Sequence, residues 1–339
     1  MTLPLIPPYN ISFSSIRAAD LCERRAALMG PGAWQAWPGG ARAGDPVAAL
    51  CYRGKNLTGL LSFLGQCIHR VAERVVRAVA ETGRSPGADA LYEDVMHPMR
   101  ALWLRTRRAF EQSPKLGYLE SRYMGRVEDL AATEHVKTRA RVGIRRLQHT
   151  PLLDDLRALD RADRLQTEEL LSMPVQIEGL PPATFFGKAD VVYIERHTLQ
   201  TDIGLIAPGK DGIPVIVDFK TGRVRWEEAV LQHSLLALLL RANGVAPHPV
   251  AGYIGRVIDL SEHGAEDDRL VLIGRGELEV AEAWVRRGAA RIAAMPRDHD
   301  GQVRLQDVVP SVGEHCRRCP MQRACLAVDD AAKGTRHAA

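Results

Sequence analysis

Four of the six cysteines in this chain of 339 residues constrain its fold more strongly than any other feature. Three of them lie in the segment CRRCPMQRAC with the spacing C-x2-C-x5-C, and one stands alone some 290 residues earlier. The four are Cys22, Cys316, Cys319 and Cys325. Because iron-sulfur clusters are held by four cysteine thiolates, this set predicts an iron-sulfur cluster that joins two distant parts of the chain as a clasp.

Zinc is an alternative for the same site, because ligand spacing alone does not separate the two metals and His315 could replace one cysteine. A thioredoxin-like redox pair is disfavoured, since Cys316 and Cys319 lie in a Pro-interrupted segment and not at the start of a helix in a βαβ unit. We interpret the remaining Cys51 and Cys67 as small buried apolar residues.

The composition is that of an ordinary globular protein, with 46% hydrophobic and 25% charged residues. The length allows about two domains. No apolar run reaches the roughly 18 residues that a membrane span needs, and the first residues lack the pattern of a signal peptide. We therefore expect no membrane association and a cytoplasmic location, where clustered cysteines bind metals more often than they form disulfides.

Positive charge is concentrated in one region. The net charge is only +4, yet residues 100–146 contain twelve Lys or Arg against five Asp or Glu. A charge run of this kind is commonly a solvated helical face. It becomes a phosphate-binding surface only if a nuclease or helicase signal is present elsewhere in the chain.

The pattern of apolar residues predicts an α/β protein with a mixed sheet flanked by helices. Helical spacing is found at 12–29, 57–80, 91–111, 120–148, 154–171, 227–242 and 277–294. Short β-branched or aromatic runs predict three strands of one sheet at 175–180, 184–195 and 212–222, and two more strands at 250–260 and 269–274.

The strand at 212–222 ends in VDFKTG, where Asp218 and Lys220 are two residues apart and therefore project from the same face. In isolation such a pair is usually a salt bridge. The preceding strand adds Asp190, however, and two carboxylates on neighbouring strands can share a hard divalent cation such as Mg²⁺. A bound metal assists phosphodiester hydrolysis by lowering the pKa of a water and neutralising phosphoryl charge. Lys220 could orient that water, and His69 could add an imidazole ligand.

In their order along the chain these elements resemble the PD-(D/E)xK nuclease superfamily. Within it they are similar to the RecB-type branch with an iron-sulfur cluster, which includes the exonuclease V enzymes, the AddB subunit and CRISPR adaptation nucleases. The G-x3-H helix motif of that branch is similar to Gly65–His69, its G-x-x-D to Gly187–Asp190, and its D-x-K to Asp218–Lys220. Its downstream helical glutamine is similar to Gln232, and its split cysteine set to the four cysteines above.

The resemblance implies His69, Asp190 and Asp218 as ligands of Mg²⁺ or Mn²⁺, together with the backbone carbonyl of Phe219. It implies Lys220 as the catalytic lysine. It also implies Gln232 as a group that positions this lysine or contacts the substrate, and it favours [4Fe-4S] over zinc at the four cysteines.

Two departures from the family pattern are visible. Leu236 stands where the family often has Tyr, so an aromatic contact to DNA is not expected there. A long insertion at 196–211 separates the two aspartates, and we expect it to form a hairpin.

The expected architecture is restriction-endonuclease-like. Its predicted parts are an N-terminal segment with the first cluster ligand at 1–56, a core helix with His69 at 57–80, a basic helical insertion at 81–165, a nuclease core at 166–300, and a C-terminal cysteine segment at 301–339.

The expected function is metal-dependent hydrolysis of DNA, as an exonuclease on single-stranded ends in repair, recombination or defence, with a helicase or integrase as a partner protein. One alternative is an iron-sulfur-stabilised DNA-binding subunit of a larger complex with weak or no autonomous cleavage. Another is a zinc-stabilised helical regulator without catalysis.

Overall fold

A mixed sheet in the order β12-β11-β10-β7-β4 organises the computed structural model of the chain. The structure describes residues 10–33, 44–107, 118–125, 130–160, 163–167, 169–201, 204–208, 210–245, 252–264, 268–299 and 301–337. The strands are β1 (Asn10–Ser12), β2 (Leu57–Thr58), β3 (Tyr118–Leu119), β4 (Arg164–Thr167), β5 (Leu170–Ile177), β6 (Leu180–Lys188), β7 (Val191–Glu195), β8 (Leu199–Thr201), β9 (Gly204–Ile206), β10 (Ile213–Lys220), β11 (Tyr253–Asp259) and β12 (Arg269–Ile273).

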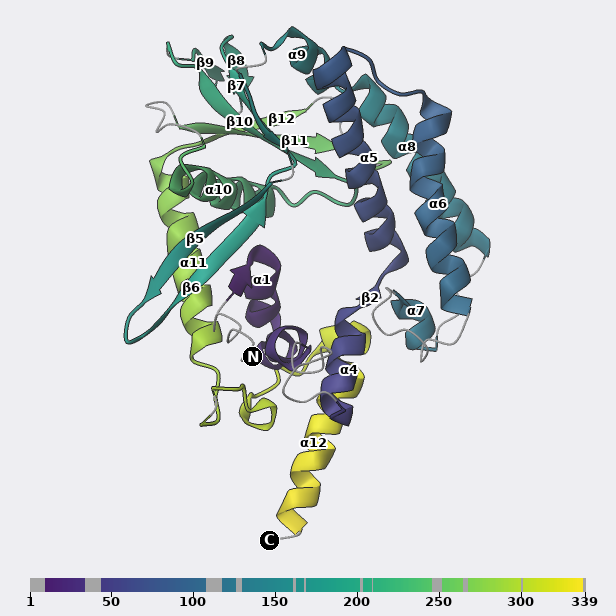
Figure 1. Cartoon of the computed structure of the whole chain (residues 1–339), viewed down its shortest axis with the longest axis vertical. Helices are drawn as coiled ribbons and strands as arrows, with labels where there is room; N and C mark the ends of the chain where they lie inside the picture. Colours follow the sequence, from purple (N-terminus) through teal and green to yellow (C-terminus); the bar gives the residue numbers. More distant parts are fainter. Residues whose placement is uncertain are drawn as a thin grey trace, which may run out of the picture.

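Helices cover both faces of this sheet (Figure 1). The helices are α1 (Phe13–Leu21), α2 (Glu23–Ala27), η1 (Leu28–Gly32), α4 (Pro46–Lys55), α5 (Leu60–Thr82), α6 (Ala88–Arg107), α7 (Glu120–Tyr123), α8 (Leu130–His149), α9 (Leu152–Ala158), α10 (Trp226–Ala242), α11 (Arg275–Ala293), η4 (Leu305–Asp307), η5 (Glu314–Arg318) and α12 (Gln322–His337). None of the described helices is long and apolar enough to cross a membrane.

The central strand β10 distributes its side chains between two hydrophobic cores. It runs parallel to β11 and antiparallel to β7. Because side chains alternate along a strand, Val215, Val217 and Phe219 pack in the core that includes α5, α6 and α8, whereas Ile216 packs on the opposite face with α10 and α11. At the end of β10, Asp218 and Lys220 therefore point toward α10, and Phe219 points toward α5.

One prediction about the sheet was wrong. The run 184–195 is not a single strand, and the three predicted strands do not share one sheet. β6 pairs with β5 and β1, whereas β7 pairs with β10 and β4. The chain changes sheets between Lys188 and Val191, which places Asp190 in the bend that separates them. The change falls at the polar interruption Lys188–Asp190 of this run, but the interruption alone does not show that the two halves pair with different sheets.

The prediction of a helix at 154–171 was correct for residues 154–158 and wrong for the rest. Helix α9 ends at Ala158, and the rest of the segment enters strands β4 and β5. Leu159 has an extended backbone that ends the helix, and Arg164–Thr167 pairs with β7 across a bulge. Pairing at a sheet edge is made by backbone groups, so the side-chain pattern did not reveal it.

Other expectations were confirmed. The helix predicted at 57–80 is α5, the one at 227–242 is α10, and the insertion before β10 forms the antiparallel hairpin of β8 and β9. The predicted helix at 120–148 is divided into α7 and α8, and residues 108–117 and 126–129 of the basic region lie outside the described residues.

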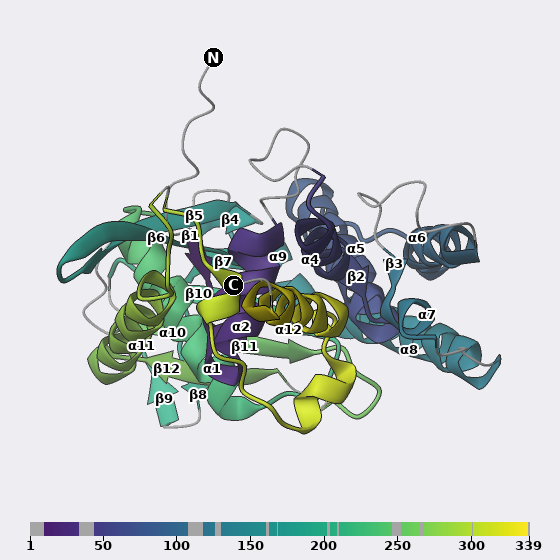
Figure 2. The ribbon, with the colours of Figure 1, turned by 90° about the horizontal axis from the view of Figure 1, so that it is seen from below.

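A third core joins the N-terminal and C-terminal parts of the described chain. It packs Ala18, Ala27 and Leu28 against Met321 and Ala324, and so brings α1 and α2 onto α12. Figure 2 shows α2 and α12 side by side. The mixed α/β architecture is thus closed by segments about 300 residues apart in the sequence.

Candidate active site

Asp218 and Lys220 lie together at the end of β10. Asp218 is buried, with 5% of its surface exposed, and the Lys220 Nζ is 2.6 Å from its Oδ2. Both side chains project from the face that α10 covers, as their spacing of two residues requires. An ammonium group is thereby fixed beside a desolvated carboxylate.

Gln232 on α10 contacts both members of this pair. Its Oε1 accepts a hydrogen bond from the Lys220 Nζ at 2.7 Å, and its Nε2 donates to Asp218 Oδ1 at 3.2 Å. An amide is suited to this position because it supplies one acceptor and one donor from the same side chain. Gln232 therefore fixes the lysine from α10 while the aspartate fixes it from β10.

Asp190 approaches the same point from the bend before β7. Its Oδ2 accepts a hydrogen bond from the backbone N–H of Phe219 at 2.8 Å and lies 3.4 Å from the Nδ1 of His69. The His69 ring also meets the Phe219 ring edge-on, with 6.4 Å between the ring centroids. The structure thus gathers His69, Asp190, Asp218, Lys220 and Gln232 around the backbone of Phe219.

The pKa of His69 reflects these neighbours. Burial lowers the pKa of the imidazole, but the hydrogen bond to Asp190 and the negative charges of Asp190 and Asp218 raise it more, so the net shift is upward. Lys220 opposes part of this shift. The two carboxylates therefore produce a locally negative site that favours a positive charge.

The donor atoms fit a hard divalent cation, although the side chains are engaged with each other. In the described part of the chain, no three His, Cys, Asp or Glu side chains converge as a metal-binding group. The buried Asp218 Oδ2 accepts no hydrogen bond of suitable geometry from a described residue, even though the Lys220 ammonium is 2.6 Å away. Carboxylate oxygens with spare lone pairs are the ligands that Mg²⁺ prefers, so a small shift of Lys220 would free one.

Two residues that support the site were missed by sequence reasoning. Thr221 packs so closely on α5 that a Cβ at Gly65 would lie 2.7 Å from the Thr221 hydroxyl, which explains why glycine suits this position. Arg139 on α8 donates through Nη2 to the Thr221 carbonyl at 3.2 Å, and its Nε is 3.5 Å from Glu262. Thr221 could have been found from its place after D-x-K, whereas Arg139 was counted only as part of the basic region.

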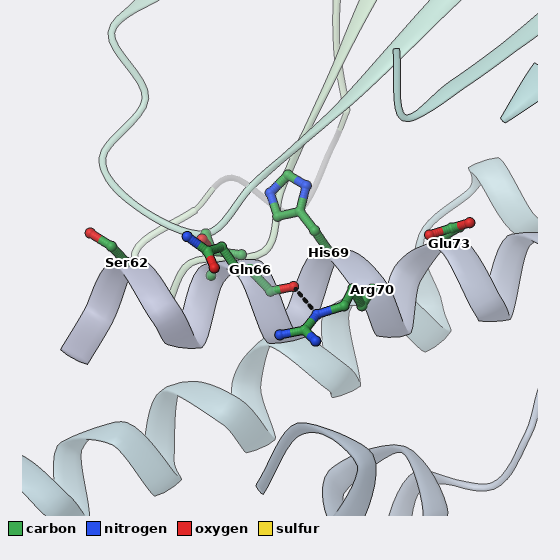
Figure 3. Close-up of a pocket in the computed structure, with 7 residues that line it drawn as sticks. Ser62, Gln66, His69, Arg70 and Glu73 are labelled. Carbon is green, nitrogen blue, oxygen red and sulfur yellow. Dashed lines mark hydrogen bonds between the residues drawn. The ribbon is translucent and has the colours of Figure 1, made fainter. Parts of the chain in front are cut away.

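An open groove of about 460 Å³ runs along α5 beside His69 (Figure 3). It is lined by Ser62, Gly65, Gln66, His69, Arg70, Glu73 and Thr221. Figure 3 shows the His69 ring pointing toward the strands, while the Arg70 guanidinium turns back along the helix below Gln66. Because the His69 Nδ1 lies 3.4 Å from Asp190, the groove borders the cluster of acidic residues formed by Asp190 and Asp218.

The four cysteines lie in or beside the third core. Cys22 is buried at the break between α1 and α2, and Cys316, Cys319 and Cys325 are partly buried. Burial raises the pKa of Cys319 and of Cys325, and the nearby charge of Cys22 contributes to both shifts. The thiols are neighbours, but within the described residues they do not form a closed ligand group.

The remaining two cysteines behave as expected. Cys51 and Cys67 are buried in separate cores, with 0% and 1% of their surfaces exposed. Burial raises the pKa of Cys51 to about 12 and also raises that of Cys67. Both therefore remain protonated thiols at neutral pH.

Comparison with known proteins agrees with this geometry. No curated protein matches the sequence. A family model described as the PD-(D/E)XK nuclease superfamily matches residues 52–326, which include His69, Asp190, Asp218, Lys220 and Gln232. The match extends over more than half of the chain, so the protein belongs to the PD-(D/E)XK nuclease superfamily.

Proposed function

We propose that this protein hydrolyses phosphodiester bonds of DNA with Mg²⁺ or Mn²⁺. The observation that carries the proposal is the contact of Asp218, Lys220 and Gln232 at the end of β10, with Asp190 held against the next backbone N–H. The two carboxylates can share a divalent ion, and the ammonium beside them can orient a water and counter the charge of the phosphate. These are the groups that metal-dependent hydrolysis of a phosphodiester uses. Superfamily membership supports a metal-dependent nuclease.

The proposed ion ligands are His69, Asp190, Asp218 and the carbonyl oxygen of Phe219. A bound divalent ion would lower the pKa of a water and neutralise charge on the phosphate. The chain itself supplies the orientation. Gln232 holds the Lys220 ammonium, which also contacts Asp218 when no ion is bound. The ammonium can donate hydrogen bonds to the attacking water and to a phosphoryl oxygen.

The preferred substrate in this proposal is a single-stranded DNA end, and the activity is that of an exonuclease. The basic residues of the helical insertion support the choice of nucleic acid, because Lys and Arg release counterions from phosphates. Among them, Arg139 and Arg146 bond to the carbonyls of Thr221 and Asp259, so they support the fold around the site instead. Repair, recombination or defence, including CRISPR adaptation, are the proposed settings, with a helicase or integrase as partner.

Lys220→Ala is the decisive variant for catalysis. We expect it to retain DNA binding and to lose cleavage of labelled oligonucleotides in Mn²⁺ or Mg²⁺, and we expect EDTA to stop the wild-type enzyme. Lys210→Ala is the matched control, because Lys210 is an exposed lysine in the turn before β10. Cleavage by Lys220→Ala at the wild-type rate would contradict the mechanism. Wild-type protein that binds but never cuts would identify a DNA-binding subunit of a larger complex.

We further propose a [4Fe-4S] cluster on Cys22, Cys316, Cys319 and Cys325, as in the RecB-type branch. Thiolates are the required donors. The proposal is supported by the packing of α1 and α2 on α12, and by the 3.8 Å distance between Arg24 Nη1 and Cys325 Sγ, which places a cation beside the thiols.

Metal analysis tests the cluster. Structural zinc sites of similar ligand number contribute on the order of 10–16 kcal/mol to folding, so loss of the cluster should loosen this end of the molecule. We expect Cys22→Ala to be colourless, without iron and sensitive to protease, whereas Cys51→Ala keeps both iron and colour. Iron retained in Cys22→Ala would exclude this ligand, and zinc without iron in the wild type would exclude the cluster.

A further inference from the structure

The groove along α5 has a lining that the proposed metal site does not use. Ser62, Gln66 and Arg70 are exposed and spaced four residues apart, so they form one stripe on the helix surface. His69 lies beside this stripe, three residues after Gln66. A ligand lying along the stripe would therefore reach the cluster of acidic residues at His69.

Arg70 is the cation of this groove. Its Nε donates to the Gln66 carbonyl at 3.3 Å, its Nη2 lies 3.5 Å from Cys67 Sγ, and its Cζ is 5.9 Å from the Phe63 ring centroid. It forms no ion pair with any described acidic side chain. Guanidinium has five N–H donors, so the donors on Nη1 remain for a ligand.

The neighbouring arginines differ in this respect. Arg74 pairs with Asp94 on α6, and Arg77 pairs with Glu73. Their charges are compensated within the protein, whereas that of Arg70 is not. The groove therefore has an uncompensated positive charge at Arg70, whereas Glu73 at its far end is already paired with Arg77.

The start of α5 adds further hydrogen-bond donors. The helix is 23 residues long, begins after Gly59, and has no side-chain cap. The first N–H groups of an uncapped helix are unsatisfied and favour anions. Arg70 lies ten residues further along the helix, about 15 Å away, so these N–H groups favour a phosphate further along the strand than the one at Arg70.

We propose that this groove binds the phosphate and base of the nucleotide adjacent to the scissile bond in single-stranded DNA. Arg70 supplies the charge, and Ser62, Gln66 and Thr221 supply hydrogen bonds to the backbone. The volume of about 460 Å³ suits a ligand of nucleotide size and is far too small for a duplex. Arg70, supported by Phe63, also presents a flat guanidinium on which an unpaired base can stack.

The position of Glu73 gives the bound strand a direction. Its carboxylate is paired with Arg77 and offers no positive charge to a phosphate, whereas Arg70 does, so the strand continues from His69 toward Ser62 and the start of α5. This inference rests on the proposed nuclease function, because it takes the scissile phosphate to lie at the acidic cluster.

The test measures binding in the Lys220→Ala background, where cleavage does not interfere. The probe is a fluorescein-labelled oligo-dT, compared with a duplex of the same length, by anisotropy across a series of salt concentrations. We expect Arg70→Ala to weaken single-strand binding about tenfold, as loss of one charged hydrogen bond implies. The slope of log K against log[salt] should fall by about 0.7, the value for one phosphate contact on a single strand.

Arg74→Ala is the matched control, since it removes the same charge one turn along α5, and it should change affinity less than twofold. Gln66→Glu should weaken binding at least as much as Arg70→Ala, because it places a carboxylate in the groove. Circular dichroism verifies that these exposed substitutions leave the fold intact.

Equal effects of Arg70→Ala and Arg74→Ala, no effect of Gln66→Glu, or an equal loss of duplex binding would overturn the inference. So would a parent protein that does not bind the oligo-dT. Cleavage plays no part in this readout, so failure of the groove proposal and failure of the nuclease proposal are distinguishable.

Discussion

Replacement of Gln232 by alanine tests how the lysine is held. The side chain makes one hydrogen bond to the Lys220 ammonium at 2.7 Å and one to Asp218 at 3.2 Å. Hydrogen bonds to charged groups contribute about 1.5–3 kcal/mol each. Gln232 and Lys220 share one of these two bonds, so the loss that matters for the position of the lysine is that of one hydrogen bond to a charged group. At about 1.36 kcal/mol per factor of ten, kcat should fall roughly 10- to 150-fold.

Steady-state kinetics on a labelled single-stranded oligonucleotide in Mn²⁺ provide the measurement. A residue that only positions Lys220 lowers kcat and leaves KM unchanged, whereas a residue that contacts DNA raises KM. Gln148→Ala is the control, because its amide bonds to the Pro86 carbonyl at the far end of α8. A wild-type kcat in Gln232→Ala would refute the positioning role, and a rise in KM alone would assign Gln232 to the substrate side.

The activity of the Gln232→Glu variant relative to the wild type should depend on pH. The new carboxylate can still accept from Lys220 but faces Asp218 as a like charge, which raises the pKa of the pair. At low pH a shared proton replaces the lost amide donor, and at high pH the two carboxylates repel each other. We therefore expect the ratio of variant to wild-type activity to fall as pH rises; a constant ratio would contradict the contact with Asp218.

Three further predictions concern residues around the site. Arg139→Ala should lower kcat about two- to tenfold, because one hydrogen bond to the Thr221 carbonyl is lost. The salt dependence of DNA binding should stay unchanged, and a smaller salt slope would show that Arg139 binds phosphate. Arg256 is buried between two aspartates, so Arg256→Ala should reduce the free energy of unfolding by about 3–5 kcal/mol in urea titrations, and a loss below about 1 kcal/mol would be inconsistent with that burial. The hydrogen bond from Arg196 lowers the pKa of Asp163. The stability that this contact contributes is therefore present above the pKa of Asp163 in the unfolded chain and is lost as pH falls through the folded pKa. Arg196→Ala should lower the melting temperature at pH 7 and much less at about pH 3, and an equal decrease at both would show that the ionised Asp163 is not responsible.

Much of the site was predictable because it depends on local periodicity. The spacing of Asp218 and Lys220 fixes their common face whatever the sheet order. The apolar pattern of α5 fixed the helix on which His69 lies. Periodicity does not show which segment packs against the end of β10. Only the family resemblance indicated that Gln232 on α10 lies beside Lys220.

The errors have a common physical origin in long-range pairing. The division of 184–195 into β6 and β7, and the pairing of β4 with β7, are decided by which backbone groups meet across sheet edges. The side-chain patterns of these short segments are compatible with either sheet, so the sequence does not show which strand each of them pairs with. The error did not displace Asp190, because the bend between the two strands carries it to β10.

The role of Arg139 was hidden for a related reason. On the sequence it belongs to a run of positive charges, and such a run suggests phosphate binding. In the structure it reaches Glu262 and the carbonyl of Thr221, which are more than 80 residues away. The contacts of Arg139 depend on how α8 packs against the end of β10, and the sequence does not show this packing. It therefore does not show whether Arg139 supports the site or is available to DNA.

The central claim is that Asp190 and Asp218 bind one divalent ion beneath the scissile phosphate. Anomalous scattering from crystals soaked in Mn²⁺ tests it most directly. The account predicts a peak bonded at about 2 Å to both carboxylates and to His69, with Lys220 displaced from Asp218, and no such peak in Asp190→Ala. Manganese bound elsewhere, or a Lys220 that still contacts Asp218 in a fully soaked crystal without a peak, would contradict it.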